Sequence, residues 1–352
     1  MFHDAFGVLE EAIERRAFPG ASIAITYSTK VVALKAFGRF TYNQNSTPVT
    51  TETVFDLASV SKVVATTSMA MLLYERGMLD LEAPLAGILP EFVGQDTRRR
   101  DITIRMLLAH SSGLPAYEKL FLRATTREEL ISHALRVPLK TTPGTHAEYS
   151  DIGFIVLGLA LERIAEESLD RFCRREVFGP LATVQTTFNP PASWKSRIPP
   201  TADDRTFRKR VIQGEVQDEN ASVLGGVAPH AGLFSTASDV ATFAHALLCG
   251  GAPLVRSETL TLFTRRQSSP PGTSRALGWD TPSAPSQSGR YLSPSAYGHL
   301  GYTGTSLWID PERQLSVTLL TNRTWPDCSN HAIKEVRPRF HDAVIEALGS
   351  QS

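Results

Sequence analysis

Ser59 and Lys62 form a Ser-x-x-Lys pair whose spacing suits nucleophilic catalysis. Side chains at positions i and i+3 of a helix share one face, so Ser59 Oγ and the Lys62 ammonium can meet, whereas Ser61 points elsewhere. A serine hydroxyl becomes a nucleophile when a neighbouring base takes its proton, and a lysine whose pKa is lowered by burial can be that base. Such a spacing arises by chance about once in a chain of this length. The pair therefore needs support from other residues.

A second group of polar residues, Tyr149-Ser150-Asp151, precedes an apolar helical pattern that starts at Ile152. Ser150 or Asp151 is predicted to be the N-cap of that helix, because short polar side chains accept hydrogen bonds from the first free N–H groups. Tyr149 has a chemical interpretation as well. A phenol held near a lysine can be a second proton carrier, which protonates the leaving group after Ser59 attacks an acyl carbon.

The third group is glycine-rich and leads into a strand pattern at residues 305–309. It reads Gly298-His299-Leu300-Gly301-Tyr302-Thr303-Gly304. Glycines at the entrance of a strand let a ligand or another backbone segment approach closely. A lone histidine such as His299 is more often structural than catalytic, so this group gains meaning only beside the other two.

The three groups, in this order and at these separations, resemble the motifs of the serine β-lactamase and penicillin-binding protein superfamily. The match is closest to the class C β-lactamase branch, which includes esterases, D-aminopeptidases and DD-carboxypeptidases. The resemblance extends over residues 8–345 and includes the segments 55–59, 107–115, 230–235 and 308–311. It implies an α+β fold of the β-lactamase/transpeptidase type.

Position by position, the resemblance implies roles for four residues. Ser59 would be the acylated nucleophile, and Lys62 and Tyr149 would share the roles of base and acid. The backbone N–H groups of Ser59 and Tyr302 would form an oxyanion hole. Such donors typically contribute about 3 to 4 kcal/mol each to transition-state stabilisation.

Asp151, His299 and Gly301 take positions that bind substrate in the family, and two of them depart from its usual residues. Asp151 stands where Asn is usual after Tyr-x, and His-Leu-Gly stands where Lys-Thr-Gly is usual. Losing an ammonium and a threonine hydroxyl while adding a carboxylate opposes the binding of the carboxylate that a β-lactam carries. We therefore expect weak β-lactamase activity and better activity on uncharged esters or small amides.

The order of strand-like and helix-like apolar patterns around these residues predicts one antiparallel sheet, made from both chain ends and flanked by helices. We expect a single domain over residues 1–352, with a sheet lobe at about 1–55 and 240–352 and an inserted, mainly helical lobe at about 56–239. The segments 189–215 and 268–296 are predicted to be long irregular connections. Strands are expected at 21–27, 31–37, 305–309 and 315–320, and helices at 8–16, 63–75, 104–109, 128–135, 152–166, 238–248 and 332–348.

Composition narrows the class of protein. The 352 residues are 42% hydrophobic and 20% charged, which is typical of a globular protein with a sizeable core. The 36 basic and 36 acidic side chains cancel, so we expect neither nucleic acid nor an anionic membrane surface as a partner. No uncharged apolar run approaches the roughly 20 residues of a membrane span. Oligomeric state leaves no signal in the sequence.

Metal, cofactor and targeting signals are not found in the sequence. The cysteines Cys173, Cys249 and Cys328 have no zinc-ligand spacing, and His230 and His245 have no acidic neighbours at such a spacing. We therefore expect no metal and no cofactor. The first 20 residues lack the charged and apolar regions of a secretory signal, which predicts a cytoplasmic protein, or a periplasmic or secreted one if the N-terminus was trimmed.

These inferences together predict a serine hydrolase that cleaves ester or amide bonds through an acyl-Ser59 intermediate. Its substrate would be a small-molecule ester, an amide or a peptide. Several alternatives stay open: a β-lactamase or DD-carboxypeptidase proper, an acyltransferase in which an alcohol or amine reaches the acyl-enzyme before water, and a non-catalytic module that senses peptidoglycan fragments.

Overall fold

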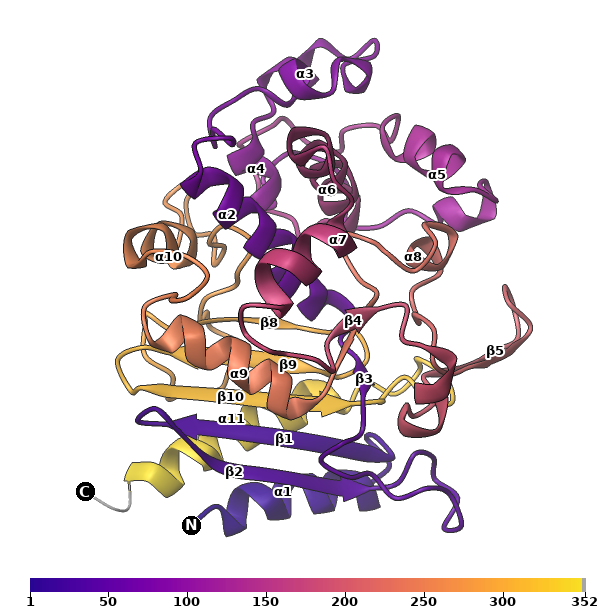
Figure 1. The fold of residues 1–352 in the computed structure, drawn as a ribbon, viewed down its shortest axis with the longest axis vertical. Helices are drawn as coiled ribbons and strands as arrows, with labels where there is room; N and C mark the ends of the chain where they lie inside the picture. The colour runs from indigo at the N-terminus through magenta and orange to yellow at the C-terminus, as the bar shows by residue number, and fades with distance from the viewer. Residues whose placement is uncertain (350–352) are drawn as a thin grey trace.

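Both ends of the chain meet in one antiparallel sheet, and the middle of the chain forms a helical region beside it (Figure 1). The computed structural model describes residues 1–349. The main sheet has five strands in the order β2-β1-β10-β9-β8. Their bounds are Gly20–Tyr27 (β1), Lys30–Gly38 (β2), Tyr297–Leu300 (β8), Ser306–Asp310 (β9) and Leu315–Thr321 (β10). The predicted α+β class with a sheet built from both ends is confirmed.

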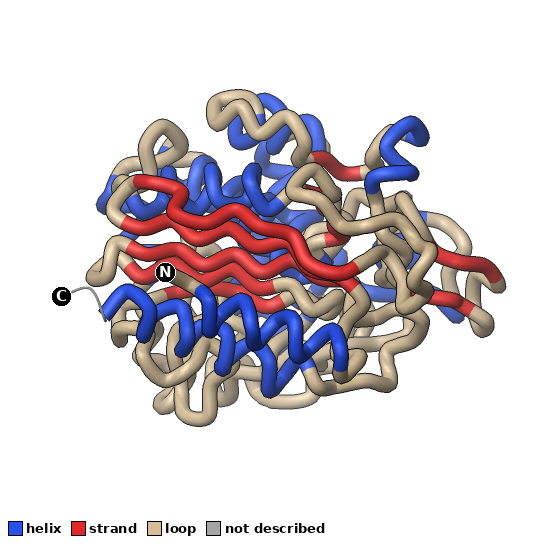
Figure 2. The backbone as a smooth tube through the Cα atoms, turned by 90° about the horizontal axis from the view of Figure 1, so that it is seen from below, coloured by secondary structure: helices blue, strands red, loops and turns tan. Residues whose placement is uncertain are grey.

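Strand β1 lies near the middle of the sheet and pairs with β2 on one side and β10 on the other. Alternate side chains of a strand point to opposite faces. Ile23 and Ile25 accordingly join the core that contains α1 (His3–Glu14) and α11 (Ile333–Gly349), whereas Ala24 joins the core on the other face. Figure 2 shows α1 and α11 side by side across one face of the strands.

The opposite face of the sheet is covered by α9 (Ala237–Leu248), which contacts β1, β9 and β10. Beyond α9 lies the helical region. Its helices, together with the outlying α10, are α2 (Ser68–Glu75), α3 (Leu85–Ile88), α4 (Ile104–Leu108), α5 (Arg127–Ala134), α6 (Asp151–Ala165), α7 (Leu169–Cys173), α8 (Glu219–Val223) and α10 (Ser257–Thr264).

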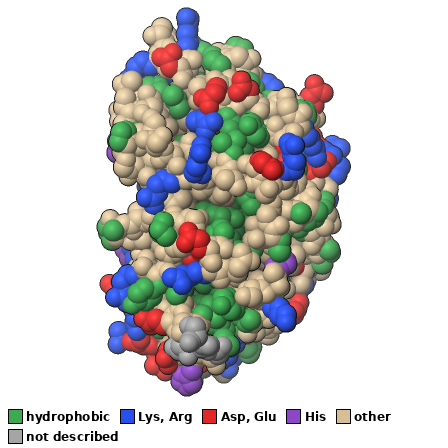
Figure 3. Space-filling model, turned by 90° about the vertical axis from the view of Figure 1, so that its left-hand side faces the viewer, with side chains coloured by type: hydrophobic (Ala, Val, Ile, Leu, Met, Phe, Trp, Pro, Cys, Tyr) green, Lys and Arg blue, Asp and Glu red, His purple; other side chains and the backbone are tan. Residues whose placement is uncertain are grey.

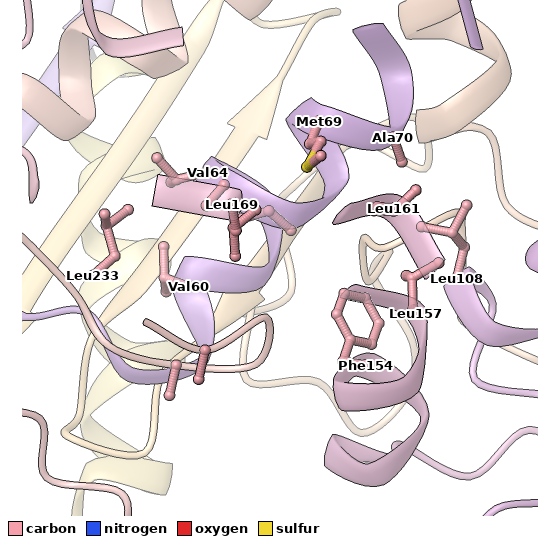
Figure 4. Packing of buried hydrophobic residues seen from close by; sticks show 14 of the residues in the cluster. Val60, Val64, Met69, Ala70, Leu108, Phe154, Leu157, Leu161, Leu169 and Leu233 are labelled. Atoms are coloured by element: carbon pink, nitrogen blue, oxygen red, sulfur yellow. The ribbon is translucent and has the colours of Figure 1, made fainter. Parts of the chain in front are cut away.

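The segment that follows Ser59 is buried in the centre of this helical region. Val60, Val64 and Met69 have relative exposures of 0 to 2% and lie in one hydrophobic cluster with Leu157 and Leu161 of α6 (Figure 4). Burying a side chain of this size contributes about 1.5 to 3 kcal/mol. Packing of this kind fixes the candidate nucleophile segment against α6, which begins at Asp151.

Three local predictions differ from the structure. The helix expected over 8–16 is α1, which begins five residues earlier, at His3, and ends at Glu14. The helix expected over 63–75 begins as a π-helix at Lys62–Thr67 and becomes α-helical only in α2; such i→i+5 turns are frequent at functional sites. The segment 189–215 is not wholly irregular, because it contains a 3₁₀ helix, Ala192–Arg197, and a two-stranded sheet of β5 (Ala202–Asp204) and β6 (Arg210–Ile212). Short polar strands of three residues lack the apolar alternation that sequence analysis detects.

A second small sheet was not predicted. It has three strands in the order β3-β7-β4, with bounds Phe55–Asp56 (β3), Thr187–Phe188 (β4) and Leu233–Ser235 (β7). It matters because β3 leads directly into Ser59. The division into a sheet lobe and a helical lobe near residues 55 and 240 stays a prediction.

The surface drawn in Figure 3 carries positive and negative side chains interspersed with small hydrophobic areas. This agrees with the balanced composition of the chain. None of the helices between residues 1 and 349 combines the length and the hydrophobicity that crossing a bilayer requires.

Candidate active site

Ser59 lies on a sharp turn that leaves strand β3 and enters the 3₁₀ turn Ala58–Val60. Ala58 has a φ of 45°, a conformation that is uncommon for a residue with a Cβ atom. Asp56 supports this turn, because its buried Oδ1 accepts a hydrogen bond of 2.8 Å from the Ala58 N–H. The turn places Ser59 on the wall of a cavity of about 710 Å³.

Lys62 is fully buried and contacts Ser59 directly. Its Nζ donates hydrogen bonds to Ser59 Oγ at 3.0 Å, to Asp151 Oδ1 at 2.7 Å and to the His230 carbonyl at 2.9 Å. These acceptors occupy all three donors of the ammonium group. Burial lowers the pKa of Lys62, and the Asp151 carboxylate opposes this shift. A lysine in this setting gives up its proton more readily than one in water.

Ser61, the other serine of the motif, has a different environment. Its side chain is buried, and its Oγ accepts a hydrogen bond of 3.0 Å from the Leu233 N–H of β7. Ser61 therefore ties the π-helix to the small sheet and does not face Lys62, as the helical spacing predicts.

Tyr149 also contacts Ser59. The Tyr149 hydroxyl donates a hydrogen bond of 2.7 Å to Ser59 Oγ, and its ring lies 4.8 Å from Lys62 Nζ. Burial raises the pKa of Tyr149 well above its usual range, with a further contribution from the Asp151 carboxylate. The phenol is consequently protonated at neutral pH and can donate a proton.

The sequence left open whether Ser150 or Asp151 is the N-cap of α6, and the structure gives the two residues different roles. Ser150 is the N-cap of α6, since its Oγ accepts a hydrogen bond of 2.9 Å from the Gly153 N–H. Asp151 is not the cap. Its carboxylate points to Lys62 and lines the cavity.

His299 lies on β8 at the wall of the same cavity, with its ring 5.9 Å from the ring of Tyr149. Its Nδ1 is 2.8 Å from the Leu300 carbonyl, which assigns the proton to Nδ1 and leaves Nε2 as an acceptor. Burial, then the positive charges of Lys62 and Arg275, hold the pKa of His299 well below its usual range. His299 is therefore neutral and does not supply the cation that a lysine would supply at this position.

His110 supports Tyr149 and α6. Its Nδ1 accepts a hydrogen bond of 3.0 Å from the Ser150 N–H, and its ring lies between the rings of Tyr149 at 4.8 Å and Phe154 at 5.0 Å. These contacts give His110 a structural role at the start of α6.

Gly301 and Tyr302 lie where the chain leaves β8. A Cβ at Gly301 would meet Thr305 Oγ1 at 1.8 Å and the Leu57 carbonyl at 2.6 Å, so only glycine fits there. Thr305 Oγ1 also donates a hydrogen bond of 3.0 Å to the Leu57 carbonyl. These contacts bring the backbone at Tyr302 to the segment that carries Ser59, and both residues line the cavity.

The remaining charged groups of the cavity were not found from the sequence. His230 Nε2 is 2.9 Å from Asp218 Oδ1, a contact between residues 12 positions apart in the chain. Arg275 lies 5.5 Å from the ring of Tyr149 and 3.5 Å from Asp280 Oδ2. The 12-residue separation of Asp218 and His230 fits neither a helix nor a strand, and Arg275 lies in the segment 268–296, which has no periodic pattern. Only the tertiary fold brings these groups together.

Within residues 1–349, no group of three or more His, Cys, Asp or Glu side chains is arranged to hold a metal ion. The described groups in direct contact at the cavity wall are Ser59, Lys62 and Tyr149.

Comparison with known proteins extends this description. The Beta-lactamase family profile matches residues 7–335. An "N-acetylmuramyl-L-alanine amidase" of Bacillus subtilis (strain 168) is 32% identical over 90% of this chain and 80% of its own. A "Putative D-alanyl-D-alanine carboxypeptidase" of Salmonella agona (strain SL483) is 31% identical over 93% of this chain and 84% of its own.

Among solved structures, "EstCE1, a hydrolase with promiscuous acyltransferase activity" has a TM-score of 0.79 at 23% identity, over 97% of each chain. This similarity shows a shared fold. The chain thus belongs to the beta-lactamase family, as its three sequence motifs indicate, and is a serine hydrolase of the β-lactamase and penicillin-binding protein type.

Proposed function

We propose that this protein cleaves ester or amide bonds through an acyl-enzyme formed on Ser59. The observation that carries this proposal is the double contact of Ser59 Oγ, which lies 3.0 Å from Lys62 Nζ and 2.7 Å from the Tyr149 hydroxyl. A nucleophile in hydrogen-bonding reach of both a base and an acid, at the wall of a cavity, is the arrangement that acyl transfer needs.

In the first step, neutral Lys62 accepts the Ser59 hydroxyl proton while Oγ attacks the acyl carbon. Two features favour Lys62 as the base and Tyr149 as the acid: burial lowers the pKa of Lys62 and raises that of Tyr149. Tyr149 then gives its proton to the leaving oxygen or nitrogen, and the Lys62 ammonium restores the phenol. Water cleaves the acyl-Ser59 bond by the same proton transfers in reverse.

The negative oxygen of the tetrahedral intermediate needs hydrogen-bond donors at fixed positions. We assign this role to the backbone N–H groups of Ser59 and Tyr302. Support comes from the close packing of Gly301 against the Leu57 carbonyl, which holds the two backbone segments together. Backbone donors do not depend on the identity of the side chain, so the change from Lys-Thr-Gly to His-Leu-Gly leaves them intact.

The neutral histidine in the third motif favours esterase-like or peptidase-like activity with weak β-lactamase activity. His299 is neutral, Lys62 is paired with Asp151, and Asp218 and Glu219 add carboxylates to the cavity wall. Cationic side chains line the cavity as well, those of Lys119, Arg275, Arg323, Lys334 and Arg337, and Arg275 supplies a guanidinium near Tyr149. Relatives named as an amidase and as putative D-alanyl-D-alanine carboxypeptidases make a peptide or amide a candidate substrate.

An acyltransferase is the second candidate, because a structural neighbour is named as a hydrolase with promiscuous acyltransferase activity. A non-catalytic module would acylate without releasing product. Incubation with an activated ester or a penicillin, followed by mass spectrometry of the intact protein, separates a catalytic protein from such a module. We expect a transient mass increase that maps to the peptide containing Ser59; a permanent adduct would favour the binding module, and no adduct on Ser59 would contradict the proposed nucleophile.

A further inference from the structure

The carboxylate of Asp151 lies inside the site, next to the candidate base. Asp151 Oδ1 is 2.7 Å from Lys62 Nζ, and the two side chains are 16% and 0% exposed. Water screens such a pair weakly, so the attraction between the charges is stronger than on a protein surface. Removing one partner of a buried ion pair leaves an uncompensated charge and is costly.

The other titratable groups around Lys62 are more distant, neutral or already engaged. Asp218 acts on Lys62 through space, and its carboxylate is bound to His230 Nε2 and the Ala221 N–H. Arg275 also acts on Lys62 through space and repels its charge. Three titratable rings near Lys62, those of Tyr149, His110 and His299, carry no charge at neutral pH. Burial raises the pKa of the Tyr149 phenol and lowers the pKa of each imidazole.

We propose that Asp151 is a positioning residue whose negative charge holds Lys62 Nζ against Ser59 and stabilises the ammonium that forms when Lys62 takes the Ser59 proton. The inference rests on the proposed function and deepens it. The arrangement Ser59–Lys62–Asp151 is chemically parallel to a serine–histidine–aspartate triad, in which a carboxylate orients the base and stabilises its protonated form. An asparagine would keep the acceptor oxygen and lose the charge.

The negative charge of Asp151 has two opposing effects on the rate of acylation. It stabilises the Lys62 ammonium during acylation, which favours the transition state. It also raises the pKa of Lys62 in the resting enzyme, which delays the appearance of the neutral base as pH rises. An opposite charge in contact typically shifts a pKa by about 1 to 3 units. Asp151→Asn should therefore lower the Lys62 pKa by about this amount, move the acid limb of kcat/KM to lower pH, and lower the plateau of kcat.

The test combines a direct titration with a pH–rate profile. The protein contains eight lysines, so ¹³C labelling of lysine gives few Cε signals, and the Lys62 signal is the one that disappears in Lys62→Arg. Glu148→Gln is the matched control, because it removes a carboxylate one residue before Tyr149 that pairs with the exposed Lys140. We expect Asp151→Asn to move the Lys62 titration and the acid limb together to lower pH, and Glu148→Gln to leave the Lys62 titration in place.

The proposal is overturned if Lys62 titrates at the same pH in Asp151→Asn and in the parent. A raised KM with an unchanged acid limb would overturn it too, and would make Asp151 a substrate-binding residue instead. The NMR titration needs no substrate, so it gives a result even if the protein proves inactive. Failure of the proposed function appears separately, as absence of any Ser59-dependent acylation.

Discussion

Tyr149 donates a hydrogen bond of 2.7 Å to Ser59 Oγ, although the two residues are 90 positions apart in the chain. Ser59 is placed by a strained turn after β3, and Tyr149 by the start of α6 and the ring of His110. The contact exists because two separately folded segments are packed through the core shown in Figure 4. The role of this contact in proton transfer can be tested by removing the Tyr149 hydroxyl.

Tyr149→Phe should lower kcat for p-nitrophenyl butyrate by about 10² to 10⁴, the usual contribution of a positioned general acid or base. The melting temperature should change little, because the ring and its packing against His110 remain. Tyr117→Phe removes a hydroxyl from the wall of the same cavity and should retain Ser59-dependent turnover. A Tyr149→Phe enzyme with the kcat of the parent would refute the role of the phenol in proton transfer.

Gly301→Ala should lower both stability and kcat. The new Cβ would lie 2.6 Å from the Leu57 carbonyl, so the backbone at Tyr302 or at Ser59 must move. Overpacking of this kind costs about 1 to 3 kcal/mol. The control is Gly7→Ala in α1, where a Cβ meets nothing within 4 Å and a gain of about 0.5 to 1 kcal/mol is expected. Urea unfolding and kcat would measure both effects, and an active Gly301→Ala enzyme of parental stability would contradict the packing argument.

Asp56 should make the free energy of unfolding depend on pH. Burial raises the pKa of Asp56 from 3.8 to about 6 in the folded protein, despite the hydrogen bonds from the Gln217 and Ala58 N–H groups. The folded state therefore binds the proton more tightly than the unfolded chain. Asp56 contributes stability below about pH 4, and this contribution is lost as pH rises to about 6, by about 3 kcal/mol in total.

Urea unfolding between pH 4 and 7 measures this dependence. The variant Asp56→Asn does not titrate, so its stability should lack the decline attributed to Asp56 in the parent. Parallel pH profiles for the two proteins would show that Asp56 is ionised in the folded state over the whole range.

The substrate preference follows from the neutral His299, which leaves the third motif without a cation. The kcat/KM for p-nitrophenyl butyrate should exceed that for nitrocefin, whose carboxylate meets no lysine in the third motif. Arg275→Gln should depress nitrocefin hydrolysis more than ester hydrolysis, because it removes a guanidinium that lies 5.5 Å from the ring of Tyr149. Efficient nitrocefin hydrolysis that disappears in Ser59→Ala would contradict this preference.

Local patterns were sufficient to predict the parts of the fold that have strong periodicity. The hairpin of β1 and β2, the strands β9 and β10, and helices α6 and α9 follow from alternation or helical spacing of apolar residues. The two-residue strands of the small sheet and the three-residue β5 and β6 are too short to show a period. The π-helix at Lys62–Thr67 has the same apolar content as an α-helix, so its hydrogen-bond pattern cannot be read from composition.

The contacts of the candidate site likewise fall into those that local sequence spacing predicts and those that depend on tertiary packing. Ser59 and Lys62 are neighbours along one helical turn, so their contact follows from local spacing. The contact of Asp151 with Lys62 spans 89 residues, and that of Lys62 with the His230 carbonyl spans 168. Contacts of this kind depend on tertiary packing. Resemblance to a family could place Asp151 at the site, but could not tell whether its carboxylate faces the base, the substrate or the helix terminus.

The most direct test of the account is the pre-steady-state hydrolysis of p-nitrophenyl butyrate by the parent, Ser59→Ala and Ser61→Ala. The account predicts a burst followed by steady turnover in the parent, loss of both in Ser59→Ala, and a retained burst in Ser61→Ala, whose side chain only ties the π-helix to β7. Equal progress curves for the parent and Ser59→Ala would contradict acyl-enzyme catalysis at Ser59 on this substrate.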